Sequence, residues 1–251
     1  KAYENNVKDL FKTGGIWDVS LNIRNTSERG FFNVTGSYMS QDSYIPGSQF
    51  DRYSFSVGGS HRLKNGVRFG GNIAFSYTDQ RSPLYGNNQS SASDGGMSSL
   101  ARAFIMPRSW DIQGFPYQTQ DGSNLLFQLS SQANNPYWAW ENDKVTTTQK
   151  RTVANFNIGY NFTKWLAIDY TLGYNGYDQD RKKIVNLGSR GFAGKGYIGK
   201  SIFNDKQLES TLLLSGEHRF GDFGLKVTLG HNYNMWVMES SASSGQEIVN
   251  P

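Results

Sequence analysis

The stretch NGVRFGGNIAFSYTDQ, residues 65–80, alternates between apolar and polar positions almost without interruption. One side carries Val67, Phe69, Gly71, Ile73, Phe75 and Tyr77, and the other carries Arg68, Gly70, Asn72, Ala74, Ser76 and Thr78. A period of two predicts a β-strand with one apolar and one polar face. The run covers about eleven residues, roughly twice the length of an ordinary strand, and it has an aromatic ring near each end.

The same alternation recurs along the chain. The further runs are residues 17–24, 32–38, 53–58, 154–160, 166–174 and 208–233, the last being a hairpin whose first arm is interrupted at Leu213. Short polar turns join successive runs near 25–30, 62–66, 161–164 and 219–223, and Asn65-Gly66 is a strong hairpin signal. We therefore expect an all-β protein of about eight antiparallel strands in four hairpins.

The connections between the hairpins are much longer than the turns within them. They span about 10 residues at 40–50, roughly 70 at 80–150 and about 30 at 176–206. In a compact soluble domain, loops of this length would count against the strand assignment. In an outer-membrane barrel they are the rule, because short turns lie on the periplasmic side and long loops on the extracellular side.

Aromatic residues bracket the predicted strands. Toward the long loops lie Trp17, Tyr38, Tyr77, Tyr174 and Tyr233, and beside the short turns lie Phe32, Phe69, Tyr160, Trp165, Phe220 and Phe223. Rings concentrate at the two water–lipid interfaces, and a tilted strand of 9–11 residues spans the hydrocarbon. These belts favour an antiparallel transmembrane β-barrel segment over a soluble β-sandwich or β-propeller, whose strands are usually shorter.

The composition excludes several other classes. The 251 residues include no cysteine, which excludes disulfide scaffolds and thiolate metal sites. No run approaches 18 consecutive apolar residues, so no transmembrane helix is expected. The net charge of +4 is spread along the chain, and the densest basic stretch, from Arg181 to Lys206, is predicted to be a solvated loop rather than a nucleic-acid site.

Chemical motifs are few. The stretch GKGYIG, residues 194–199, matches a dinucleotide-binding pattern by letter, but it lacks the required preceding buried strand and following helix. The three histidines, His61, His218 and His231, are far apart in the sequence, which argues against a metal cluster or a hydrolytic triad. We predict no catalytic residues, no cofactor and no metal site.

Two groups of residues are candidates for binding. Charges in the polar register should face the barrel lumen, where they line a pathway, bond to a plug or are merely solvated: Asp18, Arg24, Arg68, Asp169 and Lys226. Aromatic residues of the longest loop are the candidate substrate contacts, because exposed rings can stack on sugars or grip peptides: Trp110, Tyr117, Tyr137, Trp138 and Trp140. The same rings could instead fold the loop upon itself.

The direction of the strands bears on the domain organisation. If the short turns are periplasmic, both ends of the sequence lie on the extracellular side, whereas complete barrels normally begin and end in the periplasm. We therefore expect residues 1–251 to be part of a longer polypeptide.

Residues 5–63 contain a set of motifs in a fixed order, with the matching residues Asn6, Asp9, Phe11, Thr13, Gly14, Ile45, Phe50 and Arg52. Through these residues the stretch resembles the first barrel strands of the SusC/RagA-like branch of TonB-dependent outer-membrane transporters. Further on, ARAFIMPRSWDI, DGS and NNPYW are similar to the long loop of that family, and residues 148–183 resemble its next hairpin. The sequence departs from the family at residues 24–26, where RNT replaces SGG.

The resemblance implies a function and partners. Family members have a 22-stranded barrel, a plug and a TonB-interacting segment, and the last two are not seen in this sequence. The implied function is part of an active importer of large nutrients, an oligosaccharide or a peptide, driven by the TonB complex through other parts of the parent. A SusD-like surface lipoprotein and outer-membrane lipid are the implied partners, in a Gram-negative outer membrane.

The alternative is a passive porin or a structural or adhesive barrel, which a plug upstream of Lys1 would exclude. An outer-membrane enzyme ranks third, because no nucleophile–base constellation is present.

Overall fold

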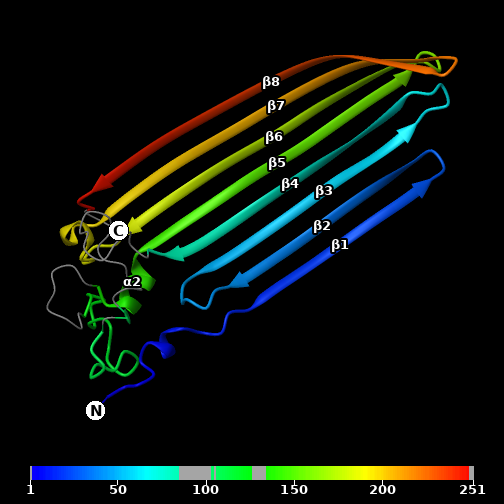
Figure 1. The fold of residues 1–251 in the computed structure, drawn as a ribbon. Coiled ribbons are helices and arrows are strands. Elements are labelled where there is room, and N and C mark those ends of the chain that lie inside the picture. Colours follow the sequence, from blue (N-terminus) through cyan, green and yellow to red (C-terminus); the bar gives the residue numbers. More distant parts are fainter. Residues whose placement is uncertain (1, 85–102, 105, 126–133, 249–251) are drawn as a thin grey trace.

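The computed structural model describes residues 2–84, 103–104, 106–125 and 134–248, and within them the chain forms an eight-stranded antiparallel sheet in the order β1 to β8 (Figure 1). The strands are β1 Ile16–Ser27, β2 Gly30–Asp42, β3 Gln49–Arg62, β4 Arg68–Pro83, β5 Lys144–Asn161, β6 Leu166–Val185, β7 Tyr197–Phe220 and β8 Phe223–Gln246. The short helices are η1 Lys8–Leu10, α2 Pro136–Asn142 and η2 Gly191–Gly194. The predicted all-β fold of eight strands in four hairpins is confirmed.

The strand register keeps the two faces of the sheet separate. Ile23 pairs with Val34, Val34 with Val57, Val57 with Ile73, and Ile73 with Ala154. Directly paired residues point to the same side of an antiparallel sheet. One row further along, the paired residues are Arg24, Asn33, Gly58, Asn72, Asn155 and Gly173. We call the two sides the apolar face and the polar face.

The short turns form as their residues predict. In the β3–β4 turn, Gly66 has φ +92°, which suits glycine, and its N–H donates to the carbonyl of Leu63 at 3.0 Å. The side chain of Asn65 accepts a hydrogen bond from the N–H of Val67 at 3.3 Å. Gly221 provides the positive φ of the β7–β8 turn, at +60°. These turns fix the register of their hairpins.

The strands are longer, and the loops shorter, than the sequence predicts. β7 and β8 have 24 residues each. The connection predicted at 176–206 covers 186–196, the one predicted at 40–50 covers 43–48, and the longest covers 84–143. The added strand residues are not distributed as one apolar and one polar face, so the hydrophobic pattern could not reveal them. Their ladder hydrogen bonds extend the hairpins all the same.

The prediction that the basic stretch from Arg181 to Lys206 is a solvated loop was wrong for most of its length. Its two ends belong to β6 and β7, and residues 186–196 form the connection between them. Opposite charges meet across these strands, as in the 2.8 Å ion pair between Lys200 and Asp180. Cross-strand pairing of opposite charges stabilises an antiparallel pair, so a run of basic residues is compatible with a strand here.

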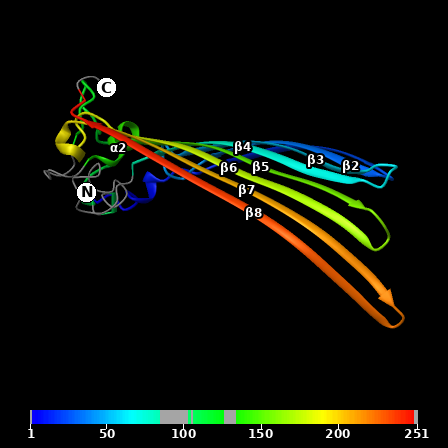
Figure 2. The same ribbon diagram turned by 90° about the horizontal axis from the view of Figure 1, so that it is seen from above.

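The sheet has two distinct ends and two open edges. Both termini and α2 lie at the end of the long connections, and the short turns lie at the other end (Figure 1). Seen from above, β7 and β8 swing away from β2–β4, so the sheet is strongly twisted and curved (Figure 2). β1 pairs with β2 alone and β8 with β7 alone.

No helix in the described ranges has the length and hydropathy needed to cross a membrane.

Apart from Pro83, Val145 and Val185 at the long-loop ends of β4, β5 and β6, the buried apolar side chains of the described residues lie in the loops and short helices. A cluster at the long-loop end joins the N-terminal segment, the β2–β3 connection and the longest loop, with the buried members Leu10, Ile45, Ala103, Met106, Ile112 and Trp140. On the sheet, by contrast, large apolar side chains are uncovered; Leu21 is 67% exposed and Leu229 is 65% exposed. The apolar face therefore lacks a covering layer within the described residues.

Candidate functional site

The apolar face exposes large hydrophobic side chains along the whole sheet. It carries Val, Ile, Leu and Phe side chains from all eight strands, and Ile73, near its middle, is 55% exposed. Soluble proteins rarely expose contiguous apolar patches beyond a few hundred Å². Because the hydrogen bonds of the inner strands are satisfied within the sheet, this face has the properties of a surface that contacts lipid.

Aromatic rings border the apolar face on the long-loop side. Tyr38, Tyr53 and Tyr77 lie in one cross-strand row, with ring centroids 4.8 Å apart for the first pair and 6.3 Å apart for the second. Trp17 adds an edge contact to Tyr38 at 6.1 Å. We call these four residues, together with Tyr174 on β6 and Tyr233 on β8, the aromatic belt. Amphipathic rings at one level are typical of a water–lipid interface.

This belt slopes across the sheet. The row of Tyr77 continues to Asp178 on β6 and to Glu239 on β8. The belt residues on those strands, Tyr174 and Tyr233, lie four and six residues closer to the short turns. Between β4 and β8 the belt shifts by six residues over four strands, which is 1.5 residues per strand. Because the belt residues of β2, β3 and β4 share one row, the average shift between β2 and β8 is one residue per strand. With a rise of about 3.3 Å per residue and about 4.8 Å between strands, a level belt requires a strand tilt of about 35–45°, as in transmembrane barrels.

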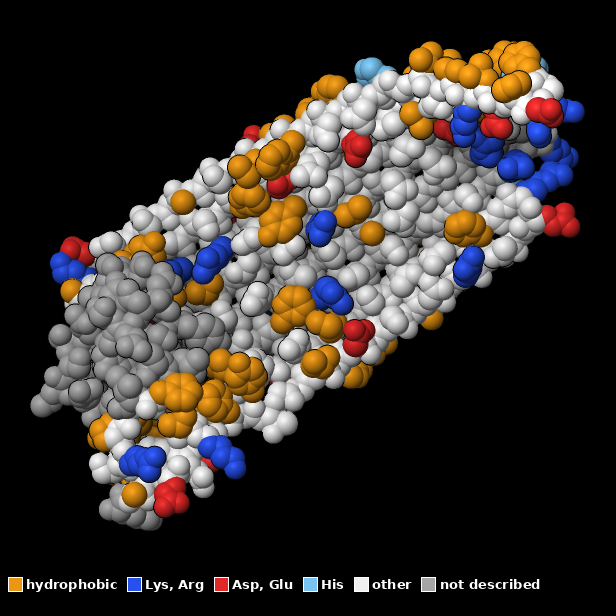
Figure 3. All heavy atoms as spheres, viewed as in Figure 1, with side chains coloured by type: hydrophobic (Ala, Val, Ile, Leu, Met, Phe, Trp, Pro, Cys, Tyr) orange, Lys and Arg blue, Asp and Glu red, His pale blue; other side chains and the backbone are white. Residues whose placement is uncertain are grey.

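The polar face carries amides, hydroxyls and a few charges. Figure 3 shows this face, where uncharged polar and backbone atoms dominate and Lys and Arg gather toward the short turns. Many of its side chains bond to one another across strands: Asn22 donates to Thr35 at 2.6 Å and Asn232 to Thr211 at 2.8 Å. Such a surface offers hydrogen-bond donors and acceptors to a polar solute.

All five charges predicted to face the lumen lie on the polar face, but the structure brings only two of them together. Arg68 and Asp169 form an ion pair at 3.0 Å. Arg24 lies over the ring of Phe31 at 5.3 Å, and Lys226 is in register with Glu217. Asp18 sits near the start of β1, in register with Met39. Their role toward a solute stays a prediction.

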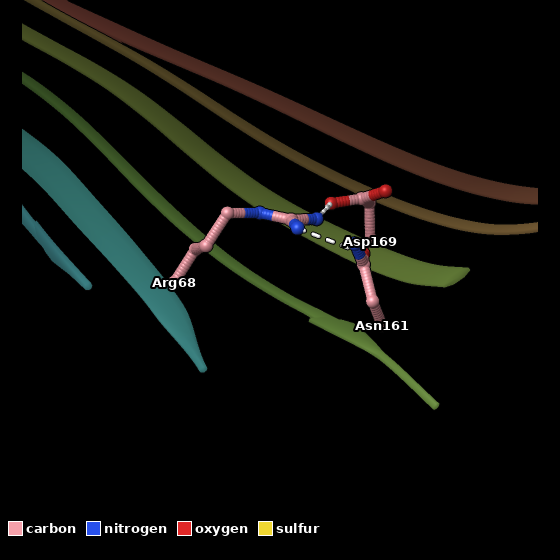
Figure 4. Close-up of polar contacts among 3 residues, drawn as sticks. All are labelled: Arg68, Asn161 and Asp169. Carbon is pink, nitrogen blue, oxygen red and sulfur yellow. Dashed lines mark hydrogen bonds and ion pairs between the residues drawn. The ribbon is translucent and has the colours of Figure 1, made fainter. Parts of the chain in front are cut away.

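The Arg68–Asp169 pair reaches over an intervening strand (Figure 4). Arg68 extends from β4 across β5, where it donates to Asn161 Oδ1 at 2.8 Å and to Asp169 Oδ1 on β6 at 3.0 Å. The residue in register between them is Gly159. A Cβ at position 159 would clash with the carboxylate and lie 2.9 Å from Arg68 Nη2. Glycine at this position therefore makes the pair possible.

Replacing Gly159 by alanine should uncouple Arg68 from Asp169. The side chains of the pair are 31% and 50% exposed, so its coupling is about 0.2–1 kcal/mol. A double-mutant cycle of Arg68→Gln and Asp169→Asn, read from urea unfolding in lipid vesicles, should give this value in the native background and none with Gly159→Ala. Gly173→Ala is the matched control, because its Cβ would have 3.9 Å of free space. Equal coupling in all backgrounds would contradict this geometry.

The aromatic residues of the longest loop come together, but not all at the surface. Trp138 and Trp140 are 1% and 3% exposed, so they fold the loop upon itself. Tyr137 stacks edge-on against Trp140 at 5.7 Å and lies 6.0 Å from Tyr117. Trp110, Tyr117 and Tyr137 are partly exposed. A substrate-binding role stays a prediction for these three residues. The two buried tryptophans pack in the interior of the loop and would hold the exposed rings in position.

A buried polar cluster at the long-loop end gave no signal in the sequence. Asp143, the C-cap of α2, is 1% exposed. Its carboxylate accepts hydrogen bonds from the N–H of Asn186 at 2.9 Å, from Ser189 Oγ at 2.8 Å and from Asn134 Nδ2 at 3.2 Å. The cluster joins the longest loop to the β6–β7 connection. Burial raises the pKa of Asp143 to about 7, although the hydrogen bonds from Asn186 and Ser189 and the charge of Lys183 act to lower it.

The raised pKa makes the packing of these loops pH-dependent. Since the folded state holds the Asp143 proton more tightly than the unfolded state does, the stabilisation is complete below about pH 4 and is lost as pH rises through about 7. The fluorescence of the buried tryptophans should show loop unfolding at lower urea at pH 8 than at pH 4.5, and Asp143→Asn should remove the difference. Asp121→Asn is the control, because hydrogen bonds from Thr119 and Ser123 lower the pKa of Asp121. An unchanged pH dependence in Asp143→Asn would refute this assignment.

Within the described ranges, no three His, Asp or Glu side chains lie close enough to hold a metal ion together.

No family model matches the chain. Over 250 residues it is 22% identical to a protein of Formosa agariphila named TonB-dependent receptor P3, covering 96% of this chain and 24% of that protein. The chain thus spans about a quarter of the length of this relative.

Solved structures show the same fold. The RagAB peptide transporter matches with a TM-score of 0.77 and 14% identity, over 99% of this chain and 27% of that one. BauA, the ferric preacinetobactin receptor of Acinetobacter baumannii, matches with a TM-score of 0.50 and 12% identity, over 92% of this chain and 30% of that one. The predicted resemblance to TonB-dependent transporters is confirmed, and the sheet has the fold of part of their barrel.

Proposed function

We propose that the chain forms part of the barrel wall of an outer-membrane active importer of large nutrients, an oligosaccharide or a peptide. The observation that carries the proposal is the two-faced sheet: eight strands with an apolar face, bordered by a belt of rings whose slope fits tilted membrane-spanning strands. The similarity to the RagAB peptide transporter supports it. The proposal assigns no chemical reaction to the chain.

In this proposal the polar face lines the interior and its amides and hydroxyls meet the passing solute. The extracellular loops then lie at the mouth, where a SusD-like surface lipoprotein would act as a lid. Energy would come from the TonB complex through other parts of the polypeptide. The partly exposed rings of Trp110, Tyr117 and Tyr137 stand at this end of the sheet, where a nutrient would first arrive.

Uptake by cells tests the proposal. A strain lacking the gene that carries this chain should lose uptake of fluorescent oligopeptides or oligosaccharides too large for passive pores. In the parent strain, a protonophore should abolish the same uptake. Import that persists with the protonophore would favour a passive porin, and unchanged import after gene deletion would contradict a transport role.

A further inference from the structure

The apolar face contains a hollow of about 650 Å³ toward its short-turn side. Its walls are mainly apolar, with Phe32, Val57, Phe69, Ile73, Phe156 and Leu172, and polar residues such as Asn25, Ser27 and His61 line its short-turn end. In the central cross-strand row, Phe32 and Phe156 flank Gly59 and Gly71, which carry no side chain. The two rings stand on strands about 14 Å apart, so the floor between them is two strands wide.

Close backbone approach requires both glycines. A Cβ on Gly59 would lie 2.5 Å from the carbonyl oxygen of Phe31, and a Cβ on Gly71 would lie 2.6 Å from that of Asn155. Neither oxygen belongs to a flexible side chain that could move aside. The hollow is therefore built into the backbone of β3 and β4, and a larger residue could not fill it without shifting a neighbouring strand.

Cations stand at the short-turn end of the hollow. Lys64 lies in the β3–β4 turn directly beyond it and Arg29 in the neighbouring β1–β2 turn, and both are exposed. In the described part of the chain, none of the ion pairs involves either side chain. Lys64 is five residues from Gly59, about 17 Å along the strand. At the strand tilt of about 35–45° this is about 12–14 Å along the membrane normal, close to the half-thickness of the hydrocarbon, about 15 Å.

We infer that this hollow is a binding site for one anionic phospholipid of the inner leaflet. An acyl chain lies over Gly59 and Gly71 between the two phenylalanine rings, and the phosphate of the headgroup meets Arg29 and Lys64. The inference rests on the proposed function, which places the apolar face in lipid and the short turns on the periplasmic side. The apolar walls and the basic rim match the two parts of such a lipid.

Native mass spectrometry tests the site. The protein that carries this chain is extracted from outer membranes and mixed with phosphatidylglycerol or with phosphatidylcholine of the same acyl chains. We expect one retained phosphatidylglycerol. Each cation near the membrane surface contributes about a fivefold preference for an anionic lipid, so Arg29→Gln/Lys64→Gln should lower the preference about 30-fold. The control, Lys8→Gln/Lys12→Gln, removes two charges at the other end of the sheet and should change nothing.

A second pair of variants tests the hollow itself. Ala154 lines the hollow, so Ala154→Trp should fill it and abolish retention of the phosphatidylglycerol. Thr152→Trp places the same ring two residues along on the same face, outside the hollow, and should retain lipid. Equal retention by all variants would overturn the site. The protein could instead be a dimer that Ala154→Trp dissociates while lipid retention stays unchanged. The hollow would then be an interface with a second copy of the chain, and the lipid site would be overturned. Recovery of the protein in the soluble fraction would overturn the proposed function as well, whereas membrane-extracted protein without lipid preference would overturn the site alone.

Discussion

Ile73→Arg should lower the free energy of unfolding in a lipid bilayer by about 2–4 kcal/mol. Ile73 lies in the middle of the apolar face, in register with Val57 and Ala154, and neither of these side chains can pair with a guanidinium. The charge would have to enter hydrocarbon or distort the bilayer. Urea titration of the protein folded into phosphatidylcholine vesicles measures the change.

Asn72→Arg is the matched control, because residue 72 is the immediate neighbour on the same strand and faces the polar side. Its replacement should cost little. Leu172→Arg on β6, which lies on the apolar face near the same depth, should repeat the loss seen at position 73. Equal losses at positions 72 and 73 would mean that neither face contacts lipid preferentially.

Residues 1–251 expressed alone should fail to form a stable closed barrel. β1 and β8 each leave one edge without a partner strand. Unpaired backbone N–H and C=O groups in hydrocarbon cost several kcal/mol each, and exposed edges pair with other chains. We expect aggregation or a partly ordered sheet in detergent, and no ligand uptake in liposomes.

Gel migration with and without boiling measures this outcome, because closed barrels run as compact, heat-modifiable monomers. The positive control is the full polypeptide that carries the chain, which should show the shift. A compact, heat-modifiable monomer of residues 1–251 would mean that β1 and β8 pair with each other, contrary to the open sheet described above.

The sequence predicts the membrane-spanning part of the fold well, because the physics there is local. Alternation along residues 67–78 gives the faces of β4, and Asn65-Gly66 gives its turn. The prediction fails toward the long loops. There the halves of β6 and β7 nearest the long loops do not separate apolar from polar residues onto opposite faces. Their pairing depends on long ladders that continue from the spanning segments, and no short window of sequence shows this.

The candidate site was predicted less completely than the fold. The polar face follows from the same period of two, so Arg68 and Asp169 were placed on it. Their bridge, however, depends on the missing side chain of Gly159 on the strand between them. The Asp143 cluster joins residues 134, 143, 186 and 189 from two loops, and such contacts appear only after the chain is folded. Burial of Trp138 and Trp140 likewise depends on how the loop packs.

Cysteine accessibility along β4 tests the central claim most directly, that one face of this sheet meets lipid and the other meets water. The 251 residues contain no cysteine, so a single substitution at each of residues 72–78 gives this sheet one thiol at a time. In intact outer membranes, a water-soluble, membrane-impermeant thiol reagent applied from outside should label positions 72, 74, 76 and 78. A lipid-soluble reagent should label 73, 75 and 77. Alternation of this kind is the result that we predict. Labelling of both sets by the water-soluble reagent would contradict the account.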